Sequence, residues 1–283
     1  MKILILLYIL ASNFVNNDEA ILTVISTSGV NLRSHPDQNA NILEKVNYGE
    51  QLSKIGDTGE RENILGINGQ WVKVKYKKLE GYVFDPYVIT SNWDFPTLPL
   101  NEKFALLYPV CTCFGNFQYN PKLKWYGIFK TPSGFEAKQV FFSYHRQAAA
   151  IGEEVCIDII DDKKPLFILG SQMNIKATSG AYAKPVGLPG AFNNTELINR
   201  NFFYDHKLNK LIYCYENREI DVSEKELIPN TLSWRGDLNE DGVEDFIVDF
   251  GDKFSKSILY LSLKVNKQVT FKKTAEFYNG YCC

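Results

Sequence analysis

Glycine, proline, asparagine and aspartate interrupt this chain every few residues from residue 22 onward, and this punctuation constrains the fold more than any other feature. The segments between the interruptions are roughly four to nine residues long and rich in β-branched and aromatic residues, as in "QWVKVKY" and "DFIVDF". The 16 tyrosines and 19 phenylalanines suit the half-buried faces of sheets. We therefore predict a mainly β protein with antiparallel sheets. Two stretches allow a short helix, residues 146–154 and residues 222–228, the second with a capping box of Ser223 and Glu226.

The first residues differ from the rest of the chain. "MKILILLYILASN" has one basic residue, an unbroken apolar run from Ile3 to Leu10 and then small and polar residues, which is the layout of a secretory signal peptide. The run is too short to cross about 30 Å of hydrocarbon as a helix, so we expect no transmembrane anchor. A buried N-terminal strand is the alternative. We predict a signal peptide over residues 1–20, cleaved near Ala11 or as late as Ala20, and a secreted or periplasmic protein.

The composition is that of a folded protein without a surface for nucleic acid. Hydrophobic residues make up 45% of the chain, enough to fill a core, and charged residues make up 23%, near the globular average. The formal net charge is −2 and the basic residues are scattered, so the basic face that nucleic acid requires is missing.

Six cysteines lie beyond residue 110, so any cross-links belong to the C-terminal half. An even number in an oxidising compartment favours disulfides, although the sequence does not choose among the pairings. Free buried thiols and a metal site are the alternatives, but the C-x-C and C-C spacings differ from those of zinc ribbons. Because no cysteine directly follows the N-terminal apolar run, a lipid-anchored lipoprotein is disfavoured. The six are Cys111, Cys113, Cys156, Cys214, Cys282 and Cys283.

Residues 22–90 contain an ordered series of motifs: "GVNLRSHPDQNANILEKVNYGEQL", then "GQWVKVKY", then "EGYVFDPYVI". This series resembles the bacterial SH3-like domain, in which an N-V/L-R-S-G-P segment, a hydrophobic–glycine turn, a W-x-K-V strand and a G-Y/W-V strand follow one another. Two departures are that His35 replaces the usual glycine and that the loop from Asp57 to Gly69 is longer. The resemblance implies a small SH3-like barrel over residues 22–90. We predict a linker over residues 91–102 and a larger antiparallel β-domain over residues 103–283.

The same resemblance implies a binding function. Such barrels often bind cell-wall peptide or a protein ligand through exposed aromatic side chains and loops, and the candidates here are Trp71, Tyr76, Tyr82 and Tyr87. The alternative for each is packing in the barrel core or at its edge, which is the interpretation we favour for the tryptophan. The fold alone does not specify the ligand.

The stretch "DLNEDGVED", residues 237–245, concentrates carboxylate and amide side chains. A calcium loop needs several oxygens at about 2.3–2.6 Å from the ion on a sharply turned backbone, and carboxylates facing one another without a cation repel. The motif resembles the D-x-N-x-D-G-x-x-D loop of FG-GAP repeats in exported proteins, which joins two strands, and this resemblance implies one structural calcium ion. A single copy argues against a β-propeller, and an acidic turn without an ion is the alternative. The predicted ligands are the side chains of Asp237, Asn239, Asp241 and Asp245 and the carbonyl oxygen of Val243.

Catalytic motifs are sparse. The sequence contains no H-E-x-x-H, G-x-S-x-G, P-loop or dinucleotide motif. SH3-like domains are often joined to NlpC-type cysteine peptidases, but "VCTCFGN" and His145 match that D-C-S-G and histidine pattern only in part. We expect His145 and His206 to be ordinary surface or turn residues. The sequence therefore predicts an exported bacterial binding protein that is not an enzyme, with a cell-envelope hydrolase acting through its C-terminal domain as the alternative.

Overall fold

The computed structural model describes residues 20–90, 103–112, 119–150, 152–159, 163–175, 195–199, 202–205, 207–208, 210–216, 218–223, 229–250, 254–266 and 268–280. The predicted linker, and all but the last residue of the predicted signal peptide, lie outside these ranges. None of the helices in the described ranges combines the length and the apolar character that a membrane crossing requires.

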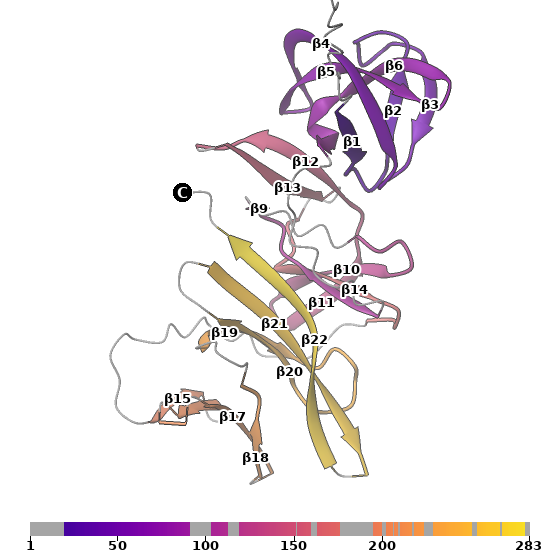
Figure 1. The fold of residues 1–283 in the computed structure, drawn as a ribbon. Coiled ribbons are helices and arrows are strands. Elements are labelled where there is room, and N and C mark those ends of the chain that lie inside the picture. The colour runs from indigo at the N-terminus through magenta and orange to yellow at the C-terminus, as the bar shows by residue number, and fades with distance from the viewer. Residues whose placement is uncertain are drawn as a thin grey trace, which may run out of the picture.

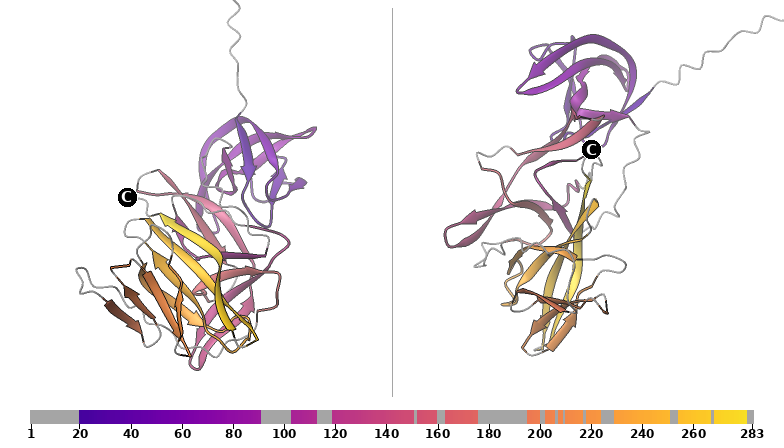
Figure 2. Two further views of the ribbon diagram at one scale, coloured as in Figure 1. Left: turned by 60° about the horizontal axis from the view of Figure 1, so that its bottom comes forward. Right: turned by 90° about the vertical axis from the view of Figure 1, so that its left-hand side faces the viewer.

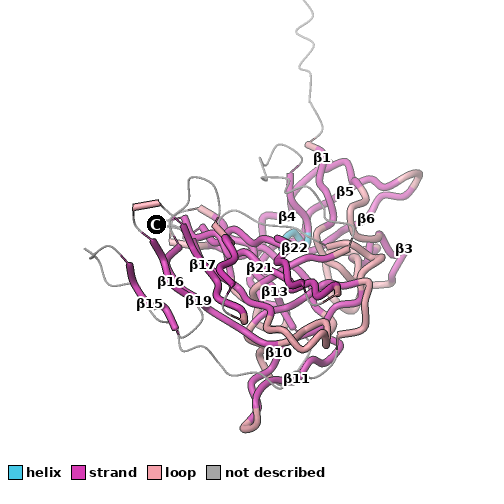
Figure 3. The backbone as a smooth tube through the Cα atoms, turned by 90° about the horizontal axis from the view of Figure 1, so that it is seen from below, coloured by secondary structure: helices cyan, strands magenta, loops and turns pink. Residues whose placement is uncertain are grey.

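The N-terminal strands form one curled antiparallel sheet in the order β3-β2-β6-β5-β4-β1-β7, and the sheet makes the small barrel at the top of Figure 1. A single 3-10 turn, η1 (Asp85–Tyr87), precedes the last strand. Figure 3 shows strands and loops almost throughout the described chain. The strands of the barrel are β1 (Ile21–Val24), β2 (Val30–Arg33), β3 (Ile42–Val46), β4 (Gln51–Ile64), β5 (Ile67–Tyr76), β6 (Leu79–Phe84) and β7 (Val88–Thr90).

Alternation along β5 explains how the barrel forms a core. Val72, Val74 and Tyr76 are buried, whereas Lys73 and Lys75 between them point outward, because successive side chains of a strand face opposite sides of the sheet. Full burial of one aliphatic side chain contributes about 1.5–3 kcal/mol, so a core of this size holds the barrel together. The aliphatic residues that complete it are Leu22, Val24, Val30, Leu32, Val46, Leu52, Val83 and Val88.

The β4–β5 hairpin takes the place of the long loop that the sequence predicts between Asp57 and Gly69. The two strands pair up to Ile64 and Ile67, and only Leu65 and Gly66 connect them. Both connecting residues have positive φ, 53° and 88°, as in the primed turns whose twist matches that of paired strands. The prediction of a loop was wrong because the polar residues of this stretch lie on an exposed two-stranded ribbon, which needs no apolar alternation.

Four further antiparallel sheets form the C-terminal part of the described chain, which confirms the mainly β fold class (Figure 2). The first, β11-β10-β14-β8, contains β8 (Phe104–Leu107), β10 (Lys124–Thr131), β11 (Gly134–Gln139) and β14 (Phe167–Ser171). The second, β12-β13-β9, contains β9 (Cys111–Thr112), β12 (Phe142–Ala148) and β13 (Glu153–Ile159). The third contains β15 (Thr195–Asn199), β16 (Phe202–Asp205), β17 (Lys210–Tyr215) and β18 (Arg218–Asp221). The fourth contains β19 (Pro229–Gly236), β20 (Asp245–Phe250), β21 (Phe254–Val265) and β22 (Gln268–Gly280).

Neither stretch with helical potential is helical where the structure describes it. Residues 146–148 end β12 and residues 153–154 begin β13, so the alanine-rich stretch spans a hairpin, with Gly152 (φ 81°) in its turn. Pairing across the sheet here overrides local helix propensity. In the second stretch, the hydroxyl of Ser223 accepts the backbone N–H of Leu211 over 2.8 Å, so this residue caps a strand, and residues 224–228 lie outside the described chain.

The barrel packs directly against the C-terminal domain. Ile25 and Ile89 of the barrel are buried in the same apolar cluster as Phe142. Tyr48 of the barrel meets Tyr119 edge-on with ring centroids 4.8 Å apart, and burial raises the pKa of Tyr48 to about 12. Strands β12 and β13 lie next to the barrel in Figures 1 and 2. The two domains therefore share apolar contacts, which fix the position of this hairpin beside the barrel.

Candidate functional site

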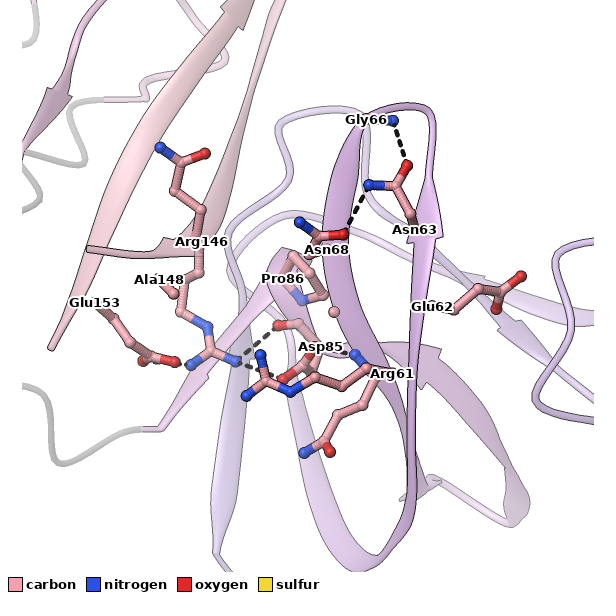
Figure 4. A pocket seen from close by; sticks show the side chains of 13 residues that line it. Arg61, Glu62, Asn63, Gly66, Asn68, Asp85, Pro86, Arg146, Ala148 and Glu153 are labelled. Carbon is pink, nitrogen blue, oxygen red and sulfur yellow. Dashed lines mark hydrogen bonds and ion pairs between the residues drawn. The ribbon is translucent and has the colours of Figure 1, made fainter. Parts of the chain in front are cut away.

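A cavity of about 580 Å³ lies where the β4–β5 hairpin of the barrel faces the β12–β13 hairpin of the C-terminal domain (Figure 4). Most of the residues that line it are polar, and its volume is within the range of about 300–1,000 Å³ typical of small-ligand sites. The barrel contributes Arg61, Glu62, Asn63, Asn68, Gln70 and Asp85. The C-terminal domain contributes Arg146, Gln147, Ala148 and Glu153.

Gly69 allows η1 to approach β5 at this cavity. A Cβ atom on Gly69 would lie 2.3 Å from Cγ of Pro86 and 2.8 Å from Oδ1 of Asp85, so no larger residue fits without displacing η1. The neighbouring Gln70 donates its backbone N–H to that same carboxylate oxygen over 2.8 Å. The glycine thus permits the close approach that holds Asp85 in the wall of the cavity.

Arg146 of β12 joins the two domains across the cavity. Its Nη2 donates to the carbonyl oxygen of Asp85 over 3.0 Å and to Oδ2 of the same residue over 3.3 Å. Its Nη1 lies 2.6 Å from Oε2 of Glu153. Burial is the largest influence on Asp85 and raises its pKa, while the Gln70 N–H and the Arg146 charge oppose the rise. One guanidinium therefore serves a carboxylate from each domain.

Arg61 enters the same cavity from β4. Its side chain is exposed, and its positive charge acts on Asp85 and opposes the rise in the pKa of that carboxyl. Figure 4 shows its guanidinium beside Asp85 and Arg146. Arg61 is therefore the more exposed of the two arginines that line the cavity.

The tip of the β4–β5 hairpin presents amide groups in fixed positions. Asn63 Nδ2 donates to Asn68 Oδ1 over 2.7 Å, and the backbone N–H of Gly66 donates to Asn63 Oδ1 over 3.0 Å. Each asparagine retains further donor or acceptor capacity beyond these bonds. The cavity therefore offers ordered hydrogen-bonding groups along the barrel side.

None of the four aromatic residues suggested by the sequence is exposed. Trp71 and Tyr76 are buried, and Trp71 Nε1 donates to Oε2 of Glu62 over 2.6 Å. Tyr82 and Tyr87 are half-buried. Core packing, the alternative favoured for the tryptophan, is what the structure has, so exposed aromatic rings do not form the ligand surface at these positions.

A second, more apolar cavity of about 440 Å³ lies on the other side of the same hairpin. Trp71, Phe84 and Tyr87 contribute to its wall, together with Leu65, whose side chain is 93% exposed at the hairpin tip. The hairpin therefore has a polar cavity on one side and an apolar one on the other.

The acidic loop joins β19 to β20 in a tight reversal. Glu240 (φ 58°) and Gly242 (φ 79°) adopt the left-handed conformation that turns the chain. Asp237 accepts the backbone N–H groups of Asp241 over 3.2 Å and of Gly242 over 3.0 Å. Asp241 accepts the N–H of Val243 over 2.9 Å. The loop therefore connects two paired strands, and its acidic side chains fold inward over its own backbone.

Ser262 of β21 lies where the oxygens of this loop converge, and nothing in its local sequence distinguishes it. Its hydroxyl oxygen lies 3.1 Å from both carboxylate oxygens of Asp241, 2.9 Å from Oδ1 of Asp245 and 3.4 Å from the carbonyl oxygen of Val243. The side-chain amide of Asn239 donates to the Ser262 carbonyl over 2.6 Å. One hydroxyl proton cannot serve four acceptor oxygens, so lone pairs are in excess at this buried position.

Asp245 is the most deeply buried of the loop carboxylates. It is 0% exposed, and burial, with a contribution from the charge of Asp237, raises its pKa to about 7. The carboxylate oxygens of Asp237, Asp241 and Asp245 are not all within 4.8 Å of one another, so an ion would have to draw them closer. The set of carboxylate, amide and carbonyl oxygens is the one that calcium prefers. The donor atoms are therefore of the kind that calcium takes, and Ser262 of β21 lies beside them.

Cys111 and Cys156 form a disulfide between the adjacent strands β9 and β13. With Glu154 they are the one group of possible metal ligands within 4.8 Å of one another in the described chain, and the disulfide removes both thiolates from metal binding. Cys214 is a free, half-buried thiol whose pKa burial raises. Cys113, Cys282 and Cys283 lie outside the described residues.

His145 is buried on β12, so the prediction of a surface residue was wrong for it. Its Nδ1 lies 2.5 Å from Oδ2 of Asp158, and it pairs in register with Cys156 across the sheet. The sheet therefore puts a histidine next to a cysteine, but the disulfide leaves neither Cys156 nor Cys111 as a thiolate nucleophile. His206, the other histidine of the C-terminal half, lies outside the described residues.

Comparison with known proteins identifies the class of the N-terminal domain. The family model of the bacterial SH3 domain matches residues 28–89, which covers most of the barrel and confirms the resemblance seen in the sequence. No curated protein and no solved structure matches the chain. The barrel is therefore a bacterial SH3 domain, a binding module, and the match does not extend to the C-terminal sheets.

Proposed function

We propose that this chain is an exported bacterial binding protein whose SH3 domain recognises a cell-wall peptide or a peptide segment of a protein ligand. The observation that carries the proposal is the polar cavity of about 580 Å³ along the β4–β5 hairpin of the SH3 domain. Its amide, guanidinium and carboxylate groups complement the N–H and C=O groups of a peptide.

Two features of the chain support export: the pattern of its first residues and a disulfide. The layout of residues 1–20 is that of a secretory signal peptide. The disulfide between Cys111 and Cys156 belongs in an oxidising compartment, since disulfides persist there and are rare in the cytosol. Together these features support a secreted or periplasmic protein that meets its ligand in the cell envelope.

Sedimentation with insoluble purified cell wall tests the binding function. Asn68→Tyr places a large side chain at an exposed position in the cavity wall, and Asn39→Tyr makes the same change at an exposed position away from it. We expect the wild type and Asn39→Tyr to co-sediment and Asn68→Tyr to bind at least about tenfold more weakly, a loss of roughly 1.4 kcal/mol. Equal retention of both variants would place the ligand elsewhere, and a wild type that stays in the supernatant would contradict the function.

We further propose that the acidic loop holds one structural calcium ion through Asp237, Asn239, Asp241, Asp245 and the Val243 carbonyl. When bound, the ion supplies the positive charge that the converging oxygens lack. The protein's own part is to hold those oxygens on a tight turn, with Ser262 bonded to Asp241 and Asp245 from the neighbouring strand. The loop provides nearly all the ligands, so the ion is structural and fixes β19 and β20 to β21.

Thermal unfolding of the full chain in EDTA, in calcium and in magnesium tests this site. Calcium at about ten times its dissociation constant adds roughly 1.4 kcal/mol to stability, which corresponds to a rise in Tm of about 3–6 °C. Asp241→Asn should lose the calcium response, whereas Glu240→Gln, which removes the same charge from the same loop without removing a proposed ligand, should keep it. Identical melting curves in all three solutions would mean that the loop binds no ion.

A further inference from the structure

We propose that the polar cavity is a two-domain receptor for a peptide that carries a free carboxylate, with Arg61 of the SH3 domain binding the carboxylate and the β12–β13 hairpin closing the opposite wall. This inference rests on the proposed peptide-binding function. It adds the chemical class of the ligand and a direct role for the C-terminal domain.

The charges of the cavity assign the anionic group to Arg61. Asp85 and Glu153 neutralise Arg146 from two sides, at 3.3 Å and 2.6 Å. Glu62 accepts the indole N–H of Trp71 and so is held in place on the barrel. The charge of Arg61 acts on Asp85, but the pair forms no direct ion pair or hydrogen bond, so the hydrogen-bond donors of this exposed guanidinium are available to a ligand. A guanidinium binds a carboxylate through two parallel hydrogen bonds. A ligand carboxylate is therefore the group that completes the cavity.

The acidic lining favours a carboxylate over a more highly charged anion. Three acidic side chains, Glu62, Asp85 and Glu153, line the cavity with two arginines. Two positive and three negative side chains leave one net negative charge in the lining, so a phosphate dianion would be repelled more strongly than a ligand with a single negative charge. Arg61 is the place where such a single charge has a positive group beside it. The same acidic groups suit the N–H groups or an ammonium group of a peptide, since Glu153 uses only Oε2 for Arg146.

The C-terminal domain forms a wall of this site. Ala148 and Glu153 lie at the facing ends of β12 and β13 and line the cavity. The ion pairs of Arg146 and the apolar contacts around Phe142 hold this hairpin beside η1. An SH3 domain alone would leave the cavity open on this side. Substitutions in the C-terminal domain should therefore change the affinity for the ligand.

Calorimetric titration of the full chain with a synthetic cell-wall stem tetrapeptide, L-Ala–D-isoGlu–L-Lys–D-Ala, tests the assignment. The probe is compared with its C-terminal amide and with the peptide in which the isoglutamate carboxylate is an amide. We expect one of the two amides to bind about tenfold more weakly, as the loss of a charge-assisted pair predicts, and that peptide identifies the carboxylate. Arg61→Gln should remove the difference between acid and amide, whereas Arg218→Gln, an exposed arginine of β18, should preserve it.

A matched pair of variants, Ala148→Tyr and Ala150→Tyr, tests the role of the C-terminal domain. Ala148→Tyr fills the cavity from the C-terminal side, and Ala150→Tyr makes the same change at an exposed position near the hairpin turn that does not line the cavity. We expect only the first to weaken the tetrapeptide, by about tenfold or more, with Tm unchanged in both.

The outcomes separate this inference from the function on which it rests. Equal binding of the acid and both amides, or full affinity in Ala148→Tyr, overturns the inference while peptide binding stands. Sedimentation with cell wall but no binding of the tetrapeptide overturns the inference and keeps the binding function. Failure in both assays overturns both.

Discussion

Asp249 of β20 is a carboxylate in a mostly buried polar cluster. Its Oδ1 accepts the hydroxyls of Ser257 over 2.6 Å and Ser233 over 3.3 Å. Burial is the largest influence on its pKa and raises it, and the two hydroxyls only partly oppose the rise. The folded protein therefore holds the Asp249 proton to a higher pH than the unfolded chain does, so this residue makes the protein less stable as pH rises from its ordinary pKa through the raised one.

Asp249→Asn should remove the loss of stability that Asp249 causes as pH rises. The amide keeps an oxygen for the two serines and carries no charge, so we expect the difference in Tm between the variant and the wild type to grow as pH rises from about 3.5 to neutral. Melting curves at several pH values measure it, and the comparison cancels the contributions of other carboxylates. Asp57→Asn, which changes a more exposed carboxylate paired with Lys54, serves as the control. A constant difference across the pH range would show that Asp249 is not the cause.

At the level of residues, sequence patterns identified groups that lie close together in the chain and missed those that lie far apart. The ligands of the acidic loop share one short motif, so they could be predicted as a set. Ser262 lies on β21, outside the acidic loop, and Arg146 lies on β12, outside the barrel whose Asp85 it binds. Neither residue belongs to a recognisable motif. Their roles depend on pairing and packing, which a single sequence does not display.

The β4–β5 hairpin turns through a residue poorly suited to its backbone. Leu65 has φ 53°, where an L-residue with a Cβ atom is strained by roughly 1–2 kcal/mol and asparagine is far better tolerated. Because Leu65 is 93% exposed, Leu65→Asn loses little packing. We expect the variant to be more stable than the wild type by roughly 1 kcal/mol, since Asn-Gly is the preferred sequence of a two-residue primed turn. Urea unfolding of the full chain measures the gain.

Gly66→Ala is the counterpart of this change. Gly66 has φ 88°, and a Cβ atom there would meet nothing within 4 Å, so any cost comes from the backbone alone. We expect a loss of about 1 kcal/mol. If both variants shift stability in the same direction, the backbone of this turn is not what determines the effect.

At the level of elements, the sequence predicted strands well and misjudged the connections. Valine, isoleucine and aromatic residues in short runs predict strands because such side chains fit the pleated surface of a sheet. The alanine-rich stretch at 146–154 and the polar stretch at 57–69 depart from that pattern, and both are hairpins. In each case pairing with a neighbouring strand decides the conformation, and a glycine with positive φ, Gly152 or Gly66, allows the turn.

On the scale of the whole molecule, the arrangement of the two domains was beyond the reach of the sequence. From the sequence alone, Ile25 and Ile89 are equally compatible with the core of an isolated barrel. In the structure they join an apolar cluster of the C-terminal domain. The cavity between the hairpins exists only because of this contact, so the site could not be predicted from the SH3 motifs alone.

The ion pair of Arg146 with Asp85 gives a direct measure of how strongly the domains are coupled. Both side chains are mostly buried, at 16% and 20% exposed, and their charge-assisted contact crosses the domain boundary. Arg146→Met removes the ion-pair partner of Asp85, and Asp85→Asn leaves the guanidinium of Arg146 with one carboxylate fewer. In a double-mutant cycle measured by urea unfolding, we expect a coupling energy of about 1 kcal/mol. Each single change removes the contact and leaves one partner unpaired, whereas the double change removes both partners.

The exposed pair of Lys77 and Glu44, which lies within the barrel, should give a smaller coupling energy in the matched cycle. No coupling between Arg146 and Asp85 would mean that the domains are held by their apolar contacts alone, and the cavity would then be free to open by movement of the hairpin.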